Sequence, residues 1–277
     1  MTRKGEGGRG KGEGLPRARK RFGQHFLEPA WVAKLIDAVS PSPDETFLEI
    51  GPGRGALTVP LAERAGRIIA VELDRDLAAA LPPRLPPHVR VVQGDFLDVD
   101  LSALLQGERM PVRVVANLPY NVASPILFKL LHESHDGRVL KDATLMLQRE
   151  VARRLVAKPG MDDYGGLAIQ VGLLADVEPV LSLPPGAFRP PPKVHSAVVR
   201  LHFRPPQVDV GDRTAFERLV RGLFLQRRKT LLNALKPVAD SFGRSAPEVI
   251  EQAGVDGGRR PETLSLEEMA RLSRAVL

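Results

Sequence analysis

The chain contains no cysteine among its 277 residues. This absence excludes disulfide bonds, thiol nucleophiles, iron–sulfur clusters and cysteine-ligated zinc. No apolar run reaches the roughly 18 residues that a membrane-spanning helix requires, and the basic N-terminus lacks the apolar stretch of a signal peptide. Aromatic residues are few, at 5%, but hydrophobic residues make up 43%, which is enough for a core. We therefore expect a folded, cytoplasmic protein that is monomeric and has no membrane partner.

The net charge of +7 is concentrated at the N-terminus. Residues 1–21 carry eight Lys/Arg and two Glu, a net charge of +6. The repeated glycines of residues 1–18 predict a flexible basic tail that cannot pack a core. Such a tail is either a solubilising leader or an electrostatic arm for nucleic-acid phosphates. The rest of the chain is nearly neutral, so nucleic-acid binding by the folded part must be argued from local clusters.

Strand-like and helix-like patterns alternate along the chain up to residue 203. This alternation predicts an α/β fold whose parallel sheet is covered by helices on both faces. Pro205-Pro206 marks a boundary, which predicts a first domain over 19–205 and a small helical domain over 206–277. Strands are expected at 46–50, 67–73, 89–92, 112–116, 144–148, 169–174 and 197–203. Helices are expected at 29–39, 74–81, 125–131, 150–157 and 214–235, near Leu57 and Leu61, and from Ser265, which forms a capping-box pattern with Glu268.

Glycines follow the first predicted strand in Glu49-Ile-Gly51-Pro-Gly53-Arg-Gly55. Glycines between a strand and a helix let the backbone approach a ligand at the carboxyl end of the strand. The spacing G-x-G-x-G differs from the dinucleotide fingerprint, and the loop lacks the Lys-Ser/Thr of a phosphate-binding loop. The acidic Glu49 disfavours a pyrophosphate and suits a ligand with an amino group. For this loop alone, a structural turn without a ligand is the alternative.

Two further carboxylates end the next two predicted strands. Glu72, 21 residues after Gly51, can accept the two hydroxyls of a ribose. Asp95 can accept a hydrogen bond from the amine of adenine, Phe96 can flank the ring, and Leu73 is assigned to the same site. Solvated strand-end acids are the alternative for each residue taken singly. Their order after the glycine loop outlines an adenosine that carries an amino acid, so the predicted cofactor is S-adenosyl-L-methionine.

Asn117-Leu118-Pro119-Tyr120 follows the fourth predicted strand. An adenine amine is a poor nucleophile because its lone pair is delocalised into the ring. The Asn117 side-chain oxygen and the Leu118 carbonyl can accept its two N–H groups, which favours a pyramidal nitrogen and stabilises developing positive charge. Pro119 stiffens the turn, and Tyr120 can stack on an extruded base. A plain Asn-Pro turn is the alternative, but beside the cofactor motifs the segment favours methyl transfer to adenine.

Several longer segments extend these motifs along residues 17–277. They are RKRFGQHFL, FLEIGPGRGALT, IAVELDRDLA, QGDFLDVD, NLPYNVASPI, MLQREVARRLVAKPG, YGGLAIQ, PPGAFRPPPKVHSAVVRL and QRRKTLLNAL. On these segments the chain resembles the bacterial 16S rRNA adenine N6-dimethyltransferase family (the kasugamycin-sensitivity type). The resemblance implies a Rossmann-like class I methyltransferase fold, with a mostly parallel seven-stranded sheet and a small all-helical C-terminal domain.

The resemblance also implies an activity and a set of site residues. The activity is transfer of four methyl groups from S-adenosylmethionine to two adjacent adenosines near the 3′ end of 16S rRNA in the small (30S) subunit, with a role in late subunit biogenesis. Phe188 would lie opposite Tyr120, so the two rings could sandwich the target base; ordinary core packing of Phe188 is the alternative. The cofactor residues implied by the family pattern are Gln24, His25, Leu27, Gly51, Glu72, Asp95 and Asn117, and we add Glu49, Gly53, Leu73 and Phe96.

Clusters of cations predict where RNA is bound. Three adjacent cations rarely all find partners within a protein, and phosphate contact is their natural use. A solvated helix end is the alternative for the cluster in the second domain. Target specificity would come from RNA shape and a loop whose bases can be splayed out. The candidate RNA-binding residues are Arg19, Lys20, Arg21, Arg153, Arg154, Arg227, Arg228 and Lys229.

Two other functions fit parts of the pattern. One is a 23S rRNA adenine N6-methyltransferase of the macrolide-resistance type, which shares the Asn-Leu-Pro-Tyr segment. The other is a non-catalytic ribosome assembly factor on the same fold, which predicts a damaged cofactor loop or a damaged Asn-Leu-Pro-Tyr segment. Both motifs are intact, and the segments QREVARRL, YGGLAIQ and QRRKTLLNAL favour the small-subunit enzyme.

Overall fold

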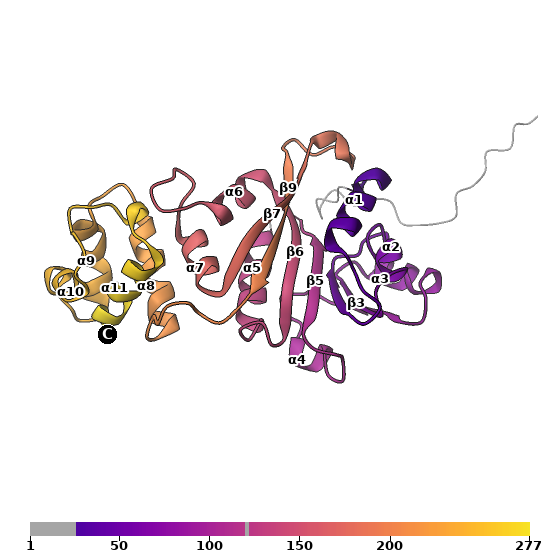
Figure 1. Cartoon of the computed structure of the whole chain (residues 1–277), viewed down its shortest axis with the longest axis horizontal. Coiled ribbons are helices and arrows are strands. Elements are labelled where there is room, and N and C mark those ends of the chain that lie inside the picture. The colour runs from indigo at the N-terminus through magenta and orange to yellow at the C-terminus, as the bar shows by residue number, and fades with distance from the viewer. Residues whose placement is uncertain (1–25, 120–121) are drawn as a thin grey trace, which may run out of the picture.

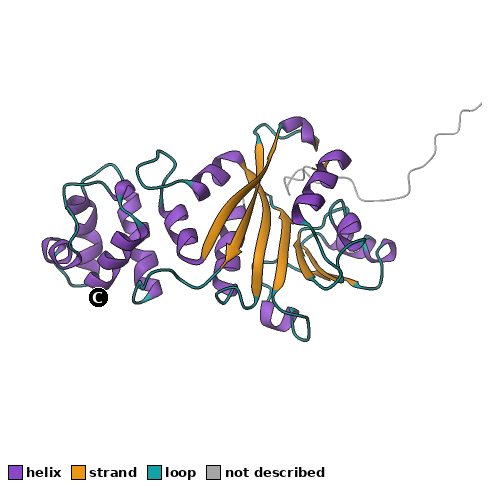
Figure 2. Ribbon diagram, in the orientation of Figure 1, coloured by secondary structure: helices purple, strands orange, loops and turns teal. Residues whose placement is uncertain are grey.

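The structure is a computed structural model that describes residues 26–119 and 122–277. A central sheet with helices on both faces fills the middle of the molecule, and the C-terminal helices gather at one end (Figures 1 and 2). The strands are β1 (Phe26–Leu27), β2 (Thr46–Ile50), β3 (Arg67–Glu72), β4 (Val89–Gln93), β5 (Val112–Asn117), β6 (Leu140–Gln148), β7 (Ala175–Leu183), β8 (Phe188–Arg189) and β9 (Ser196–Phe203). The α-helices are α1 (Pro29–Val39), α2 (Thr58–Ala62), α3 (Arg75–Ala80), α4 (Leu101–Leu104), α5 (Ala123–Glu133), α6 (Arg149–Val156), α7 (Gly166–Leu174), α8 (Arg213–Leu225), α9 (Leu231–Ser241), α10 (Ala246–Ala253) and α11 (Leu266–Val276).

The large sheet has seven strands within the described residues, in the order β4-β3-β2-β5-β6-β9-β7. Neighbours from β4 to β6 are parallel, whereas β9 runs antiparallel to both β6 and β7. The predicted α/β class and mostly parallel sheet are therefore confirmed. Because β2 to β6 run the same way, their carboxyl ends meet at one edge, where Ile50 lies beside Val71 and Ala116. This edge is where open α/β sheets bind ligands.

Burial on both faces explains why β2 reads as a short, nearly continuous apolar run. Leu48 and Ile50 pack on one face with residues of α4, α5 and α7, whereas Phe47 packs on the other with residues of α1 and α2. A strand covered on both faces shows no polar alternation. The sequence expectation for 46–50 matches β2, and that for 29–39 matches α1.

The expected strand at 169–174 is wrong, because these residues belong to helix α7. Helix α7 is buried by the sheet on one side and by the C-terminal helices on the other, so its apolar residues show no helical stripe. A short run that is apolar all round does not distinguish a buried helix from a strand. The strand lies one element later, at β7, which includes Pro179; proline is tolerated there because β7 is an edge strand.

The expected single helix over 214–235 is also wrong. It is two helices, α8 and α9, separated at residues 226–230. The amides of Leu231 and Leu232 bond to the carbonyls of Arg259 (2.6 Å) and Gly257 (3.0 Å), so α9 begins against a distant segment. Sequence periodicity within one stretch does not reveal such a break.

The C-terminal helices pack against the sheet region through a continuous core. Apolar residues of α8, α9 and α11 belong to the same buried cluster as those of α5 and α7. The Tyr164 hydroxyl donates a hydrogen bond of 2.9 Å to the Leu264 carbonyl across this contact. Helix α11 starts with the predicted capping box of Ser265 and Glu268. The boundary expected at residue 205 falls in the connection between β9 and α8 and stays a prediction.

Candidate functional site

The glycine loop after β2 lies open at the carboxyl edge of the sheet. Gly51, Gly53 and Gly55 all have left-handed backbone, with φ of 69°, 59° and 82°. Glycine adopts such angles without a steric penalty. A Cβ atom added at Gly51 would meet nothing within 4 Å, whereas one at Gly55 would lie 2.9 Å from the side chain of Leu81. The loop is thus packed at Gly55 and leaves room for a ligand at Gly51.

Glu72 ends β3 and is fixed by the backbone on both of its oxygens. Its Oε2 accepts from the Gly53 amide and its Oε1 from the Asp74 amide, each at 2.8 Å. Burial raises the pKa of Glu72, and these amides oppose that effect. Because a carboxylate oxygen has two lone pairs, each oxygen can still accept a further hydrogen bond. Glu72 is therefore oriented to receive two hydroxyl groups side by side.

Glu49 lies in the middle of the sheet, directly before the glycine loop. Its side chain is 1% exposed, and its Oε2 has no hydrogen-bond partner among the described residues. The buried Thr58 hydroxyl, at the start of α2, lies close enough to this carboxyl to lower its pKa, but no hydrogen bond of ordinary geometry joins the two groups. Burial raises the pKa of Glu49 to about 7. A buried acceptor without a well-formed hydrogen bond, two residues before a glycine with open space beside it, is typical of a site that a bound group completes.

The residues expected to hold an adenine lie at the ends of β3 and β4. Leu73 is 48% exposed. Asp95 is exposed too, and its Oδ1 accepts a hydrogen bond of 2.9 Å from the Leu97 amide. Phe96 is only 4% exposed, and the Lys129 ammonium lies 5.4 Å from its ring centroid. Leu73 and Asp95 are therefore open to a ligand, and the expected contact of Phe96 with adenine stays a prediction.

Asn117 ends β5, next to the glycine loop. Ala116, the residue before it, pairs with Ile50, the residue before Gly51. Leu118 is buried, and the carbonyl of Pro119 accepts from the Val122 amide at 3.1 Å as the chain enters α5. The fold thus brings Asn117 to the same edge as Gly51, although 66 residues separate them in sequence.

A two-stranded sheet joins the N-terminal part of the described chain to the loop with Phe188. Strands β1 and β8 are antiparallel and pair Leu27 with Phe188. Both side chains are buried in the cluster on the α1 face, with Phe188 2% exposed. Glu28 and Arg189 form an ion pair of 2.7 Å beside this sheet. Two-residue strands carry no periodicity, so the sequence did not reveal them, and the base sandwich by Phe188 stays a prediction.

Six predicted residues lie outside the described part of the chain. They are Arg19, Lys20, Arg21, Gln24, His25 and Tyr120.

The predicted RNA-binding cations of the described chain differ in their partners. Arg153 pairs with Asp163 at 2.8 Å. Arg227 pairs with Glu262 at 2.9 Å and donates to the Asp162 carbonyl at 3.1 Å, so it ties α8 to the segment before α7. Arg154, Arg228 and Lys229 are exposed. Exposed cations of this kind suit phosphate contact, and RNA binding by all five stays a prediction.

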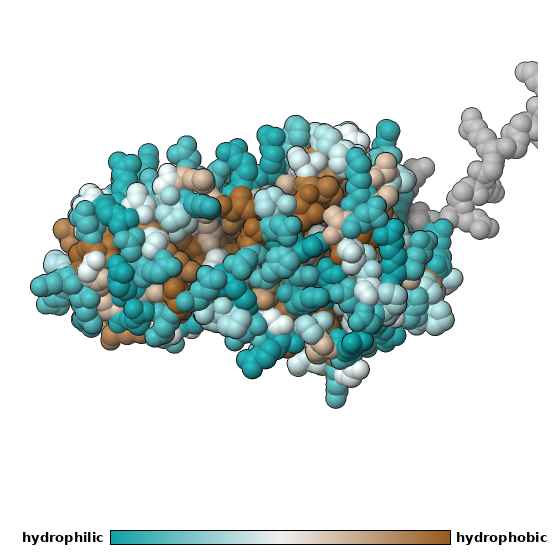
Figure 3. Space-filling view, in the orientation of Figure 1, coloured by the Kyte–Doolittle hydropathy of each residue, from teal (hydrophilic) through white to brown (hydrophobic). Residues whose placement is uncertain are grey.

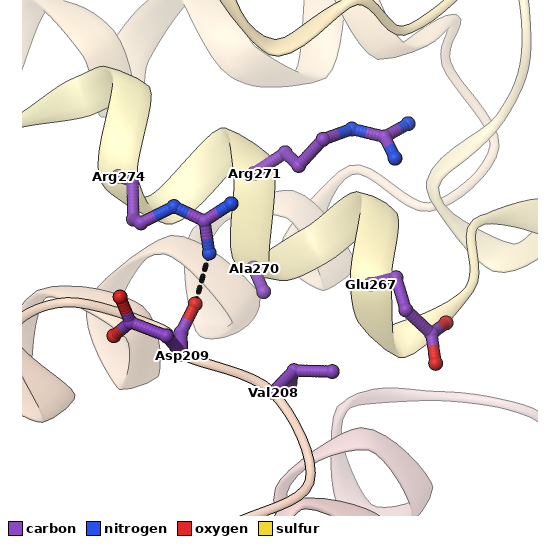
Figure 4. Close-up of a pocket in the computed structure, with 6 residues that line it drawn as sticks. All are labelled: Val208, Asp209, Glu267, Ala270, Arg271 and Arg274. Atoms are coloured by element: carbon purple, nitrogen blue, oxygen red, sulfur yellow. Dashed lines mark hydrogen bonds between the residues drawn. The ribbon is translucent and has the colours of Figure 1, made fainter.

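Other surface features lie away from this edge. A hollow between α11 and the connection before α8 is lined by Val208, Asp209, Glu267, Ala270, Arg271 and Arg274 (Figure 4). Arg274 reaches across it to the backbone carbonyl of Asp209. On the face drawn in Figure 3, hydrophilic side chains surround separate hydrophobic areas. No helix of the described residues is long and apolar enough to cross a membrane, and these residues contain no group of acids and histidines suited to a metal ion.

The sheet order, the glycine loop and the acids at successive strand ends define a class I methyltransferase, whose methyl donor is S-adenosylmethionine. A family model described as ribosomal RNA adenine dimethylase matches residues 16–276. The chain belongs to this family, and it is accordingly an S-adenosylmethionine-dependent rRNA adenine dimethyltransferase.

Known relatives are similar over nearly the whole chain. A protein of Geobacter metallireducens named ribosomal RNA small subunit methyltransferase A is 48% identical, over 96% of this chain and 98% of its own. A protein of the same name from Nitrosococcus oceani is 46% identical, over 93% and 96%. Among solved structures, a dimethyladenosine transferase from Plasmodium falciparum has a TM-score of 0.75 and 26% identity, over 90% and 96% of the two chains. The 23S rRNA methyltransferase ErmE has a TM-score of 0.63 and 28% identity, over 91% and 99%.

Proposed function

We propose that this enzyme dimethylates N6 of two adjacent adenosines near the 3′ end of 16S rRNA, within the small ribosomal subunit. The observation that supports 16S rRNA as the substrate is the identity of 40–48% to several proteins named ribosomal RNA small subunit methyltransferase A, over at least 93% of the chain. Identity to the 23S rRNA enzyme ErmE is lower, at 28%. The proposal includes a monomeric enzyme that acts in the cytoplasm at a late stage of subunit assembly.

The residues at the carboxyl edge fit S-adenosylmethionine. The space beside Gly51 can hold the amino-acid part of the ligand, and Glu49, two residues earlier in β2, keeps an oxygen without a well-formed hydrogen bond. Glu72 presents two oriented oxygens to a ribose, and Leu73 and Asp95 present an apolar surface and an acceptor to an adenine. Gln24, His25, Leu27, Gly53 and Phe96 complete the proposed binding set. When bound, S-adenosylmethionine supplies a methyl group on positively charged sulfur.

Asn117 and the residues after it would activate the adenine amine. The side-chain oxygen of Asn117 and the carbonyl of Leu118 accept its two N–H groups, which keeps the nitrogen lone pair free to attack the methyl carbon. The nitrogen becomes positively charged as its bond to carbon forms, and these fixed acceptors stabilise that charge. The nitrogen then loses a proton to solvent, so the step needs no strong general base.

Aromatic rings and exposed cations would hold the RNA. Tyr120 stacks on the extruded base, and Phe188 supports its other side if its ring, which is 2% exposed in the free protein, becomes accessible when RNA binds. The cations from the first domain and from the region between α8 and α9 contact phosphates. Adjacent target adenosines in a loop can be splayed out one after the other into a single pocket.

The test is methylation of purified, undermethylated small and large subunits with labelled S-adenosylmethionine. Nuclease digestion and mass spectrometry should place two dimethyladenosines at adjacent positions near the 3′ end of 16S rRNA. Label in 23S rRNA instead would establish the macrolide-resistance type of activity. Donor binding without methylation of either subunit, at any stage of assembly tested, would favour a non-catalytic assembly factor.

A further inference from the structure

Lys129 connects the helix that follows Asn117 to the segment that follows β4. It lies in α5, and its ammonium donates hydrogen bonds to the carbonyls of Leu97 (2.9 Å) and Val99 (2.5 Å). The same ammonium lies 5.4 Å from the ring centroid of Phe96. All three contacts fall within six residues of Asp95, on the segment expected to hold adenine. One side chain therefore links the two walls of the candidate site.

The local structure of the 94–100 segment explains why it needs such a link. The Asp95 side chain accepts from the Leu97 amide, and its carbonyl accepts from the amides of Asp98 and Val99. The segment is thus a tight turn between β4 and α4, and its first residue, Gly94, still bonds to β3 through the Glu72 carbonyl at 2.9 Å. The carbonyls of Leu97 and Val99 point toward α5, where the ammonium satisfies both. Hydrogen bonds from a charged donor are stronger than those between neutral groups.

The position of Lys129 makes the link relevant to the donor. Helix α5 begins at Ala123, six residues after Asn117, and its apolar side is buried in the core. Helix α5 is a fixed support, and Lys129 adds to the other anchors of the turn, which are the bond from the Gly94 amide to the Glu72 carbonyl at 2.9 Å and the burial of Phe96 in the core. The cation over Phe96 adds an attraction to the ring face. Lys129 therefore ties the residues next to Asp95, and the Phe96 ring itself, to α5.

We propose that Lys129 is a positioning residue for the methyl donor: it holds the Asp95–Phe96 turn against α5 and so sets the affinity for the adenine half of S-adenosylmethionine. This inference rests on the proposed placement of the donor at Gly51, Glu72 and Asp95. Lys129 does not contact the reacting atoms. Its loss should therefore weaken donor binding and leave the chemical step of bound enzyme nearly unchanged.

The experiment compares Lys129→Met, Lys129→Gln and Lys141→Met in the full chain. Methionine keeps the apolar stem and removes the donors, whereas glutamine restores two neutral N–H donors. Lys141 is the control for loss of a lysine charge away from the site: it is 55% exposed, whereas Lys129 is partly buried, and it pairs with Glu45 at the opposite edge of the sheet. Isothermal calorimetry with S-adenosylmethionine and S-adenosylhomocysteine reports affinity without turnover, and circular dichroism with thermal melting reports folding.

We expect Lys129→Met to weaken the binding of both ligands about tenfold, which is the order expected for lost charged hydrogen bonds. The KM for S-adenosylmethionine should rise to a similar extent, with kcat changed less than about twofold. Lys129→Gln should recover part of the loss, and Lys141→Met should match the original chain. The same loss should appear with 5′-methylthioadenosine, which lacks the amino-acid half of the donor.

Three results would overturn the inference. Unchanged affinity in folded Lys129→Met would show that the link is irrelevant to the donor. A loss for S-adenosylmethionine that is absent for 5′-methylthioadenosine would place the effect away from the adenine. A fall of kcat in parallel with a lower melting temperature, reproduced by Lys129→Gln, would assign Lys129 a structural role. If the original chain itself bound no donor, the proposed function would fail, which is a separate outcome.

Discussion

The two edges of the central sheet both bury carboxylates, but they treat them in opposite ways. At the amino edge, Arg113 in β5 bonds to Asp142 at 3.0 Å and to Glu45 at 2.9 Å. Burial would raise the pKa of Glu45, but the hydrogen bonds and charges of Arg113 and Lys141 outweigh it and lower that pKa. At the carboxyl edge, burial raises the pKa of Glu49 and of Glu72. No ion pair to either of these two acids is found among the described residues.

This difference in pairing distinguishes residues that stabilise the fold, at the amino edge, from residues that can bind a ligand, at the carboxyl edge. Arg113 also donates to the carbonyls of Val39 and Ser40, so one guanidinium fixes the end of α1 to two strands. Among the described residues, no buried side-chain nitrogen or oxygen at that edge lacks a hydrogen-bond partner. At the carboxyl edge, Glu49 keeps an unsatisfied oxygen and the glycine loop leaves space. Such imbalance is a cost in the free protein that a bound partner can relieve.

The largest expected effect comes from Arg113→Met at the amino edge. The change leaves Asp142 buried without its charge partner, which should lower the free energy of unfolding by about 3–5 kcal/mol. Urea denaturation measures this loss, and the activity per folded molecule should stay near that of the original chain. The contrast between the edges would be wrong if stability fell by less than about 1 kcal/mol or if activity alone were lost.

At the carboxyl edge, Asn117→Ala should lower activity and leave the free energy of unfolding nearly unchanged. Removing an oriented acceptor lowers kcat on the order of 10²-fold or more, and donor affinity should be less affected than the rate. Single-turnover methylation of small subunits and calorimetry with S-adenosylmethionine measure the two quantities. Near-normal turnover would contradict the role that we assign to Asn117.

Glu49→Gln tests how much the buried carboxyl of Glu49 lowers the free energy of unfolding as pH rises. The folded-state pKa of about 7 lies above the ordinary value of 4.5. The native protein therefore binds more protons than the unfolded chain between these values, and stability should fall as pH rises from about 5 to 7. Glutamine removes this dependence, so its stability relative to the original chain should rise by on the order of 2 kcal/mol between pH 5 and 8. The free energy of unfolding of both chains is measured in urea at several pH values. If it depends on pH in the same way for the two chains, Glu49 has no such cost.

The smallest effect is expected for single cations that face solvent. Arg228→Ala should weaken RNA binding modestly and reduce the slope of log Kd against log salt by about 1. Arg227→Ala should change this slope less, because Arg227 is already paired with Glu262. Filter binding of a small-subunit RNA fragment over a range of salt concentrations measures both slopes. Equal slope changes for the two variants would contradict this distinction.

Much of the sheet and its site could be predicted from local patterns. The expected strands at 46–50, 67–73, 89–92, 112–116, 144–148 and 197–203 correspond to β2, β3, β4, β5, β6 and β9. Because these strands alternate with helices, the order Gly51, Glu72, Asp95 and Asn117 already placed four residues at strand ends that would share an edge. The expected strand at 169–174 was wrong because burial on all sides erased the helical stripe of α7.

Contacts between distant segments were not predictable from those patterns. The pairing of β1 with β8, the bond from Lys129 to the 94–100 turn and the use of Arg227 as a tie to Glu262 each join segments more than 29 residues apart. No periodicity or spacing encodes such a meeting, because it depends on how whole elements pack.

By itself, the sequence determined the kind of chemistry, since glycines, acids and the Asn-Leu-Pro-Tyr segment follow strands in an order that suits one donor and one class of acceptor. The tertiary structure decided which charged groups are paired within the protein and which stay available to a ligand. Burial and partner geometry set the state of a carboxylate or a guanidinium, and both arise only when the chain has packed. The same residue types therefore stabilise the amino edge of the sheet and leave the carboxyl edge ready for a ligand.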